Sequence, residues 1–197
     1  MITTRSKRGR FTLVVAKNPV TFSEMLEAEH RNFQLLSARA PDKMLQVYRA
    51  GKLFLPDRHR RAEMGRELYA FVAESLANSY PLEVGRNGQF MTSQPKRHTY
   101  TRKATEELKA LIIEGVLQTY DSEKCECISI SDLNAEDVFV QTTRHGKLRI
   151  RIVSCPKILS RINPARVIKL ILGTTWKSGE SSISLAPEEP RQLFERF

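Results

Sequence analysis

The sequence has no long apolar segment and few cysteines, and each shortage excludes a class of protein. No apolar run approaches the ~18 residues that a membrane-spanning helix needs. Residues 1–10 are basic, but the apolar run that follows, 11–16, is too short for a signal peptide. Cys125, Cys127 and Cys155 cannot all pair with one another, which favours free thiols. We therefore expect an intracellular protein, cytoplasmic or nuclear, that is neither secreted nor inserted in a membrane.

The sequence also lacks the common catalytic and metal-binding motifs. It contains no phosphate-binding Gly-rich loop ending in Lys-Ser/Thr, no Gly-x-Ser-x-Gly and no His-Glu-x-x-His. The pair Cys125 and Cys127, with Cys155 or His98 to complete a site, matches the usual spacing of structural zinc sites poorly. The acidic residues within 132–137 resemble the carboxylate cluster that a metal-dependent nuclease needs, but a turn before a hairpin explains them equally well. We therefore predict a non-enzymatic protein without a metal or another cofactor.

What is present is the composition of an ordinary globular protein. Hydrophobic residues make up 41% of the 197 residues and charged residues 27%, which is close to the usual mix. This length suits one domain with its own core. We expect a flexible basic arm over 1–10, a globular domain over 11–176 and a C-terminal tail over 177–197.

Apolar residues at helical spacing predict four helices, over 22–38, 58–79, 102–120 and 164–172. Thr21 and Glu24 form the ends of a capping box before the first helix. The last helix has Asn163 as its N-cap, Pro164 at its first position and Gly173 just past its end. These signals favour amphipathic helices that cover a sheet.

Alternating residues and turn signals predict strands between the helices. Residues 43–55 fit a short helix or a strand, and 125–131 fit a strand. Hairpins are predicted near 82–92, around an Asn-Gly turn, and at 138–153, around His145-Gly146. The expected fold is a single α+β domain with a mostly antiparallel sheet, packed by three to four amphipathic helices and preceded by the basic arm.

Positive charge is concentrated in two parts of the chain. The net charge is +10. Residues 1–10 carry four cations and no acid, and residues 138–179 carry nine cations and no acid. A long stretch of one sign repels itself unless a partner neutralises it. A polyanionic partner is therefore favoured, and a generally basic protein with uneven charge is the alternative.

The hairpin at 138–153 is the main candidate site. A two-residue turn would pair Thr142 with Arg149 and Val140 with Arg151. The outward face would then carry four cations, Arg144, Lys147, Arg149 and Arg151, and the core face would carry Phe139, Leu148, Ile150 and Ile152. Cations ~7 Å apart along a strand can meet successive phosphates. The alternative is that these cations pair with acids from elsewhere, such as Glu106, Glu107 or Glu136.

Other cations extend the candidate nucleic-acid interface. They lie after the hairpin, in the N-terminal arm and in a basic loop: Lys157, Arg161, Arg5, Lys7, Arg8, Arg10, Lys96 and Arg97. Tyr100 and Trp176 are candidates for stacking on bases, with a place in the core as the alternative for each.

These observations favour a non-enzymatic nucleic-acid-binding protein, with RNA slightly ahead of DNA and largely sequence-independent electrostatic contacts. A basic arm on a compact domain also suits a viral coat or matrix protein, by analogy of architecture. A second copy of the chain, in a homo-oligomer, is a further candidate partner. One alternative is an interaction protein whose basic face meets an anionic membrane or an acidic protein. Another is an enzyme that processes nucleic acid with active residues that no motif marks.

Overall fold

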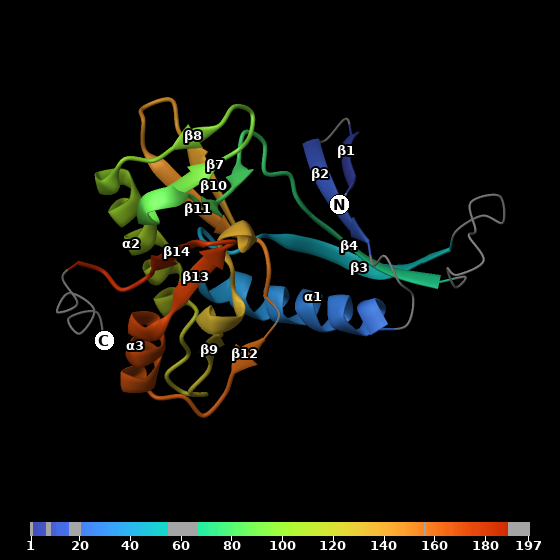
Figure 1. The fold of residues 1–197 in the computed structure, drawn as a ribbon. Helices are drawn as coiled ribbons and strands as arrows, with labels where there is room; N and C mark the ends of the chain where they lie inside the picture. Colours follow the sequence, from blue (N-terminus) through green and yellow to red (C-terminus); the bar gives the residue numbers. More distant parts are fainter. Residues whose placement is uncertain (1, 7–8, 16–20, 55–66, 156, 189–197) are drawn as a thin grey trace.

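Three α-helices pack against several small sheets in a computed structural model of the chain (Figure 1). The structure describes residues 2–6, 9–15, 21–54, 67–155 and 157–188. All strand pairs between named strands are antiparallel among these residues. The predicted fold class, a single α+β domain with a mostly antiparallel arrangement of strands, is confirmed.

The N-terminal part forms a four-stranded sheet covered by the first helix. Its strands are β1 (Ile2–Ser6), β2 (Gly9–Val15), β3 (Val47–Phe54) and β4 (Glu67–Glu74), in the order β1-β2-β4-β3. Helix α1 (Thr21–Arg39) lies along this sheet, and its Phe33 ring packs 6.2 Å from that of Phe71 on β4. The helix predicted over 22–38 is therefore confirmed.

The helix predicted over 58–79 is wrong, because residues 67–74 form strand β4. The apolar residues of this segment lie on both faces of a strand, since neighbours such as Ala70 and Phe71 are both buried. A strand that is buried on both faces gives an apolar run that also fits helical spacing. Residues 55–66, which include the predicted first turn of that helix, lie outside the described residues.

The N-terminal arm and the ambiguous segment also take definite forms. Residues 2–6 and 9–15, where we predicted a flexible arm and then a short strand, form the antiparallel pair β1 and β2. Residues 47–54 form strand β3, which settles the ambiguity over 43–55 in favour of a strand. The division into arm, domain and tail stays a prediction.

A second sheet contains the predicted hairpin. Strands β10 (Val138–Thr142) and β11 (Leu148–Ile152) pair with each other, and β10 also pairs with β5 (Tyr80–Pro81). The free edge of β11 is joined by the segment before β3, because Ile152 N–H donates to the Lys43 carbonyl at 2.7 Å. Helix α2 (Arg102–Gln118), which confirms the helix predicted over 102–120, packs on β11.

The hairpin near 82–92 is confirmed as β6 (Glu83–Val84) and β7 (Phe90–Thr92), joined through the 3-10 turn η2 (Arg86–Gly88) and extended by β8 (His98–Thr99). The strand predicted over 125–131 is limited to β9 (Cys127–Ile128), which pairs with β12 (Ile158–Leu159). Short 3-10 turns η3 (Ile130–Asp132) and η4 (Ala135–Asp137) follow β9.

The C-terminal elements are α3 (Pro164–Gly173) and the hairpin β13 (Thr175–Ser178) with β14 (Ser181–Ser184). Helix α3 begins as predicted, with the Asn163 side chain accepting from Arg166 N–H at 2.9 Å. Gly173 is its last residue rather than the residue beyond it. Strand β14 lies within the segment 177–197 that the sequence analysis assigned to a C-terminal tail.

One continuous core joins these elements. Its largest fully buried side chains come from α1, β4, β7, α2, β11 and the segments between them, including Phe33, Phe71, Phe90, Leu108, Ile112 and Ile152. Helix α3 adds Val167, Ile168 and Ile171 to it. No helix in the described parts of the chain is both long enough and apolar enough to span a bilayer.

Candidate nucleic-acid interface

The β10–β11 hairpin forms where the sequence predicted it, but its register differs by one residue. Thr142 faces Leu148, Gln141 faces Arg149 and Phe139 faces Arg151. The turn spans three residues rather than two, with Thr143 N–H donating to the Lys147 carbonyl at 2.8 Å. Gly146 has a φ of 73°, the left-handed residue that ends this type of turn. The predicted pairs of Thr142 with Arg149 and Val140 with Arg151 are therefore wrong.

This register moves Phe139 to the face that carries the arginines. Val138 and Val140 lie opposite Ile152 and Ile150 and fill the core face. Phe139 instead is half-buried and lines a groove together with Arg149 and Arg151. The prediction that Phe139 faces the core is wrong, whereas the outward alternation of Arg149 and Arg151 is confirmed.

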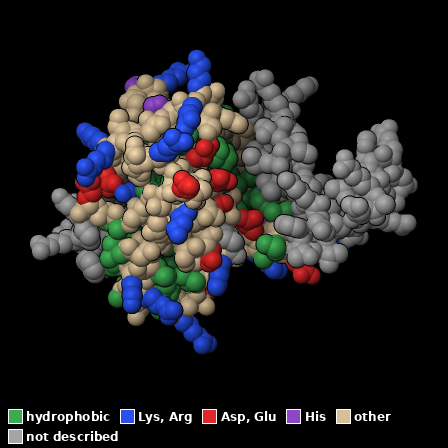
Figure 2. Space-filling model, viewed as in Figure 1, with side chains coloured by type: hydrophobic (Ala, Val, Ile, Leu, Met, Phe, Trp, Pro, Cys, Tyr) green, Lys and Arg blue, Asp and Glu red, His purple; other side chains and the backbone are tan. Residues whose placement is uncertain are grey.

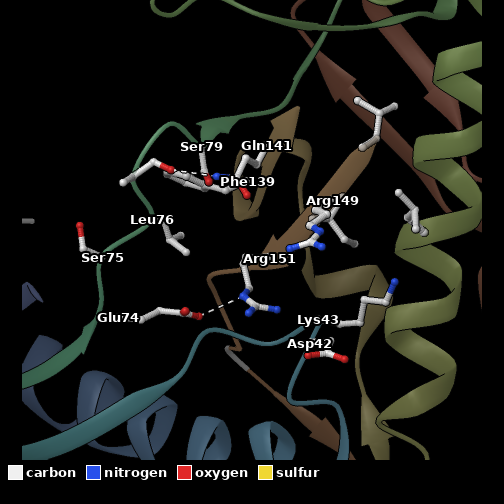
Figure 3. A pocket seen from close by; sticks show the side chains of 14 residues that line it. Asp42, Lys43, Glu74, Ser75, Leu76, Ser79, Phe139, Gln141, Arg149 and Arg151 are labelled. Atoms are coloured by element: carbon white, nitrogen blue, oxygen red, sulfur yellow. Dashed lines mark hydrogen bonds and ion pairs between the residues drawn. The ribbon is translucent and has the colours of Figure 1, made fainter. Parts of the chain in front are cut away.

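Arg151 is already paired with a carboxylate. Its Nε lies 3.0 Å from Glu74 Oε1, and the two side chains are only 27% and 21% exposed (Figure 3). The same Glu74 oxygen accepts from Gln46 N–H at 3.1 Å. Glu74 ends β4, so this carboxylate connects the N-terminal sheet to the hairpin. For Arg151, the alternative that a hairpin cation pairs with an acid from elsewhere in the chain therefore holds. The acid is Glu74, which was not among the candidate partners named from the sequence.

The groove beside the hairpin has a volume of about 510 Å³. Arg149 and Arg151 project into it from β11, with Leu76, Ser79 and Phe139 on one side and Asp42 and Lys43 on the other (Figure 3). Lys43 Nζ is paired with Glu114 on α2 at 2.8 Å. Arg149 is exposed, and it has no ion pair with any residue that the structure describes.

Two loops distant in sequence bring four further cations to one end of the molecule. The connection between β7 and β8 carries Lys96 and Arg97, and the turn between β10 and β11 carries Arg144 and Lys147. Both loops lie at the same end in Figure 1, where cationic and histidine side chains gather on the surface in Figure 2. We call this group, Lys96, Arg97, Arg144 and Lys147, the basic end.

Tyr100 joins the two loops of the basic end. Burial raises the pKa of Tyr100. The side chains of Thr92, where the first loop begins, and Thr142, where the second begins, both interact with the Tyr100 hydroxyl and offset part of that rise. The His98 ring lies edge-on to Tyr100 at 4.8 Å. The two loops therefore meet at the buried side chain of Tyr100.

The four cations of the basic end are exposed, and none of them has an ion pair within the described ranges. The nearest cation on α2 differs, because Arg102 is paired with Glu188. Long-range attraction for an anion is strongest where like charges lie together without compensating acids. The basic end therefore offers a polyanion the uncompensated positive charge that the sequence predicted for residues 138–179.

The structure does not bring all predicted contacts together. Lys157 and Arg161 are exposed, but they flank β12, which lies at the other end of the molecule from the hairpin turn (Figure 1). The backbones of Arg5 and Arg10 are paired in the register of the β1–β2 pair. Lys7 and Arg8 lie outside the described residues. The positive charge of residues 138–179 is thus divided between two ends.

The two candidate stacking residues are core residues. Tyr100 is 6% exposed and Trp176 is 2% exposed, with the Trp176 ring 6.0 Å from that of Phe90. Neither presents an aromatic face on the surface. Phe139 is the half-buried aromatic beside the cations, and sequence reasoning missed it because the assumed register turned it inward.

The cysteines do not form a metal centre in the part of the chain that the structure covers. No cluster of three or more His, Cys, Asp or Glu side chains suited to a metal occurs among these residues. Burial raises the pKa of the Cys127 thiol to about 11. Burial and, to a lesser extent, the Glu29 carboxylate raise the pKa of Cys155. Both thiols therefore stay protonated and unreactive at neutral pH.

Comparisons of this chain with known protein families, with curated proteins and with solved structures found no match.

Proposed function

We propose that this protein binds nucleic acid without acting on it, and that the basic end is its main contact surface. The supporting observation is the convergence of Lys96, Arg97, Arg144 and Lys147 from two loops, all exposed and without ion pairs among the described residues. Ammonium and guanidinium groups contact phosphates without reading base sequence. Binding is therefore expected to be electrostatic and largely independent of sequence.

The proposal predicts a strong dependence on salt. Each phosphate that a cation neutralises contributes about −0.9 to the slope of log K against log salt on duplex, and about −0.7 on a single strand. Four cations that act together give a slope on the order of −3 to −4 by the same rule. The measurement is a titration of generic RNA and DNA of equal length, by fluorescence anisotropy, at several salt concentrations.

The matched test compares charge reversal at the two ends of the molecule. The double variant Arg144→Glu with Lys147→Glu alters the basic end, and Lys157→Glu with Arg161→Glu alters exposed cations beside β12. Both lower the net charge equally. We expect the double variant at the basic end to weaken binding by on the order of tenfold. The slope of log K against log salt should become shallower by the share of about two phosphate contacts. The double variant beside β12 should have a much smaller effect.

Equal losses from the two double variants would show that net charge, rather than the basic end, attracts the polymer. No binding of either RNA or DNA by the wild type, together with flotation on vesicles that contain anionic lipid, would replace the proposal with a membrane-surface function.

A further inference from the structure

The groove beside the hairpin is a second feature that can receive a ligand, and it adjoins the basic end. Arg149 lies two residues after Lys147, so the groove continues from the basic end along β11. Its walls come from the end of β4 and the following segment, from β10 and β11, and from Leu111 on α2. Its volume of about 510 Å³ is within the ~300–1,000 Å³ of pockets that hold small organic ligands.

Only one cation in the groove is uncommitted among the described residues. Arg151 is paired with Glu74 at 3.0 Å, and Lys43 is paired with Glu114 at 2.8 Å. Arg149 has neither partner and is exposed, and its guanidinium group is directed into the groove (Figure 3). A planar guanidinium can hold a phosphate through two parallel hydrogen bonds. The free guanidinium can therefore hold one anionic group, and Asp42 is the acid of the lining that has no ion pair among the described residues.

The remaining lining suits a flat ring rather than a bare ion. Leu76 and Phe139 lie together on one side of the groove (Figure 3), and Leu111 and Leu148 add half-buried apolar surface. The hydroxyls of Ser75 and Ser79 form no side-chain hydrogen bond with other described residues. An aromatic face, free hydroxyls and a phosphate-binding arginine in the same groove can serve the ring, the ring edge and the phosphate of one nucleotide.

We propose that this groove binds one nucleotide unit, with its phosphate on Arg149 and its base against Phe139 and Leu76. The inference rests on the proposed nucleic-acid binding and names the site where a single-stranded end or an unstacked nucleotide would be held. It assigns to Phe139 the stacking role that Tyr100 and Trp176 cannot fill, because those two are buried.

The test uses 5′-AMP as the ligand and two fragments of it as controls, ribose 5-phosphate without the base and adenosine without the phosphate. Binding is followed by the NMR shifts of the methyl groups of Leu76, Leu111 and Leu148 in the full chain. We expect 5′-AMP to bind with shifts at these methyls, and each fragment to bind at least about tenfold more weakly, since each lacks one of the two contacts. Equal binding of 5′-AMP and ribose 5-phosphate would overturn the proposal.

Two variants separate the contacts. Arg149→Met retains an aliphatic side chain and removes the charge, and the matched control Arg166→Met changes an exposed cation on α3. Arg149→Met should weaken 5′-AMP binding by about tenfold or more, and Arg166→Met should leave it unchanged. Phe139→Leu should weaken it by about fivefold or more, because the aromatic face is lost. Undiminished binding by Arg149→Met and Phe139→Leu would place the ligand elsewhere.

Failure of nucleotide binding in the groove can be distinguished from failure of nucleic-acid binding at the basic end. The double variant Arg144→Glu with Lys147→Glu should lose affinity for long RNA while it still binds 5′-AMP. Arg149→Met should lose most of its affinity for 5′-AMP and a smaller part of its affinity for long RNA. If long RNA and DNA fail to bind but 5′-AMP binds, the function proposed for the basic end fails alone. If an acidic peptide shifts the same methyls at lower concentration than 5′-AMP, the groove is a protein-binding site and the inference fails.

Discussion

Both the turn and the base of the β10–β11 hairpin carry positively charged residues, but those at the turn are exposed and unpaired among the described residues, and the one at the base is half-buried in an ion pair. At the turn, Arg144 and Lys147 are exposed and have no ion pair within the described ranges. At the base, Arg151 is half-buried and fixed to Glu74, which also accepts the Gln46 N–H. Four positive residues that look equivalent in the sequence thus divide into residues available to a ligand and residues used to join two sheets.

The difference teaches that charge density along a chain overstates the charge that a partner meets. An exposed cation keeps its full attraction for an anion, whereas one in a partly buried pair has its field cancelled by its own carboxylate. Reversing Arg151 together with Arg149 would place a new carboxylate against Glu74, so a loss of binding there would be confounded by a loss of stability.

The largest expected effect concerns the two faces of β11. Ile152→Ala should lower the free energy of unfolding by about 2–5 kcal/mol. Ile152 is fully buried, and its side chain lies beside Gly115 of α2. Arg149→Met, on the groove face, should change it by no more than about 0.5 kcal/mol. Urea denaturation of both variants measures the difference. Comparable losses would mean that the faces of β11 are assigned wrongly.

The next effect concerns the base of the hairpin. Glu74→Ala should cost about 1–3 kcal/mol, since it leaves the Arg151 side chain and the Gln46 N–H without their acceptor. The control is Glu136→Ala, at an exposed acid near β10 that was a sequence-based candidate partner for the hairpin cations. It should be close to neutral in the same thermal or urea unfolding experiment. A neutral Glu74→Ala would show that the pair at the base adds nothing to the connection between the sheets.

The smallest effect concerns the turn itself. Gly146→Ala should destabilise by about 1 kcal/mol, because a side chain at a φ of 73° is strained. Gly173→Ala, at the end of α3 with open space around the added methyl group, should be neutral or slightly stabilising. Differential scanning calorimetry can compare the two. If Gly146→Ala raises the melting temperature, the three-residue turn and the register that depends on it are in doubt.

Local signals in the sequence were sufficient for much of the fold. Helix α3 begins at the N-cap that the sequence predicted, with the Asn163 side chain accepting from Arg166 N–H at 2.9 Å. Helix α2 also begins with a cap, since the Thr101 hydroxyl accepts from Ala104 N–H at 3.2 Å. The hairpins around residues 82–92 and 138–153 follow from Asn-Gly and His-Gly turns. Such signals act within a few residues, so no tertiary contact is needed to interpret them.

One error arose where distant contacts decide, and the other where the length of a local turn decides. Residues 67–74 become a strand because β2 and β3 lie on either side of them and α1 covers one face. The site prediction depended on a register that one extra turn residue shifted, which reversed the direction of Phe139. Since the side-chain period of a strand is two, a shift of one residue exchanges its faces.

The sequence by itself determined the fold class, the helices with strong caps, the position of the main hairpin and the acid-free run of cations, because composition and short-range spacing contain that information. Only the tertiary structure decided which cations are free. It paired Arg151 with an acid 77 positions earlier in the chain, at Glu74. It also placed the loop of Lys96 and Arg97 at the same end of the molecule as the turn of Arg144 and Lys147. Charge availability depends on distances in space, and those distances follow from packing between segments that are remote in sequence.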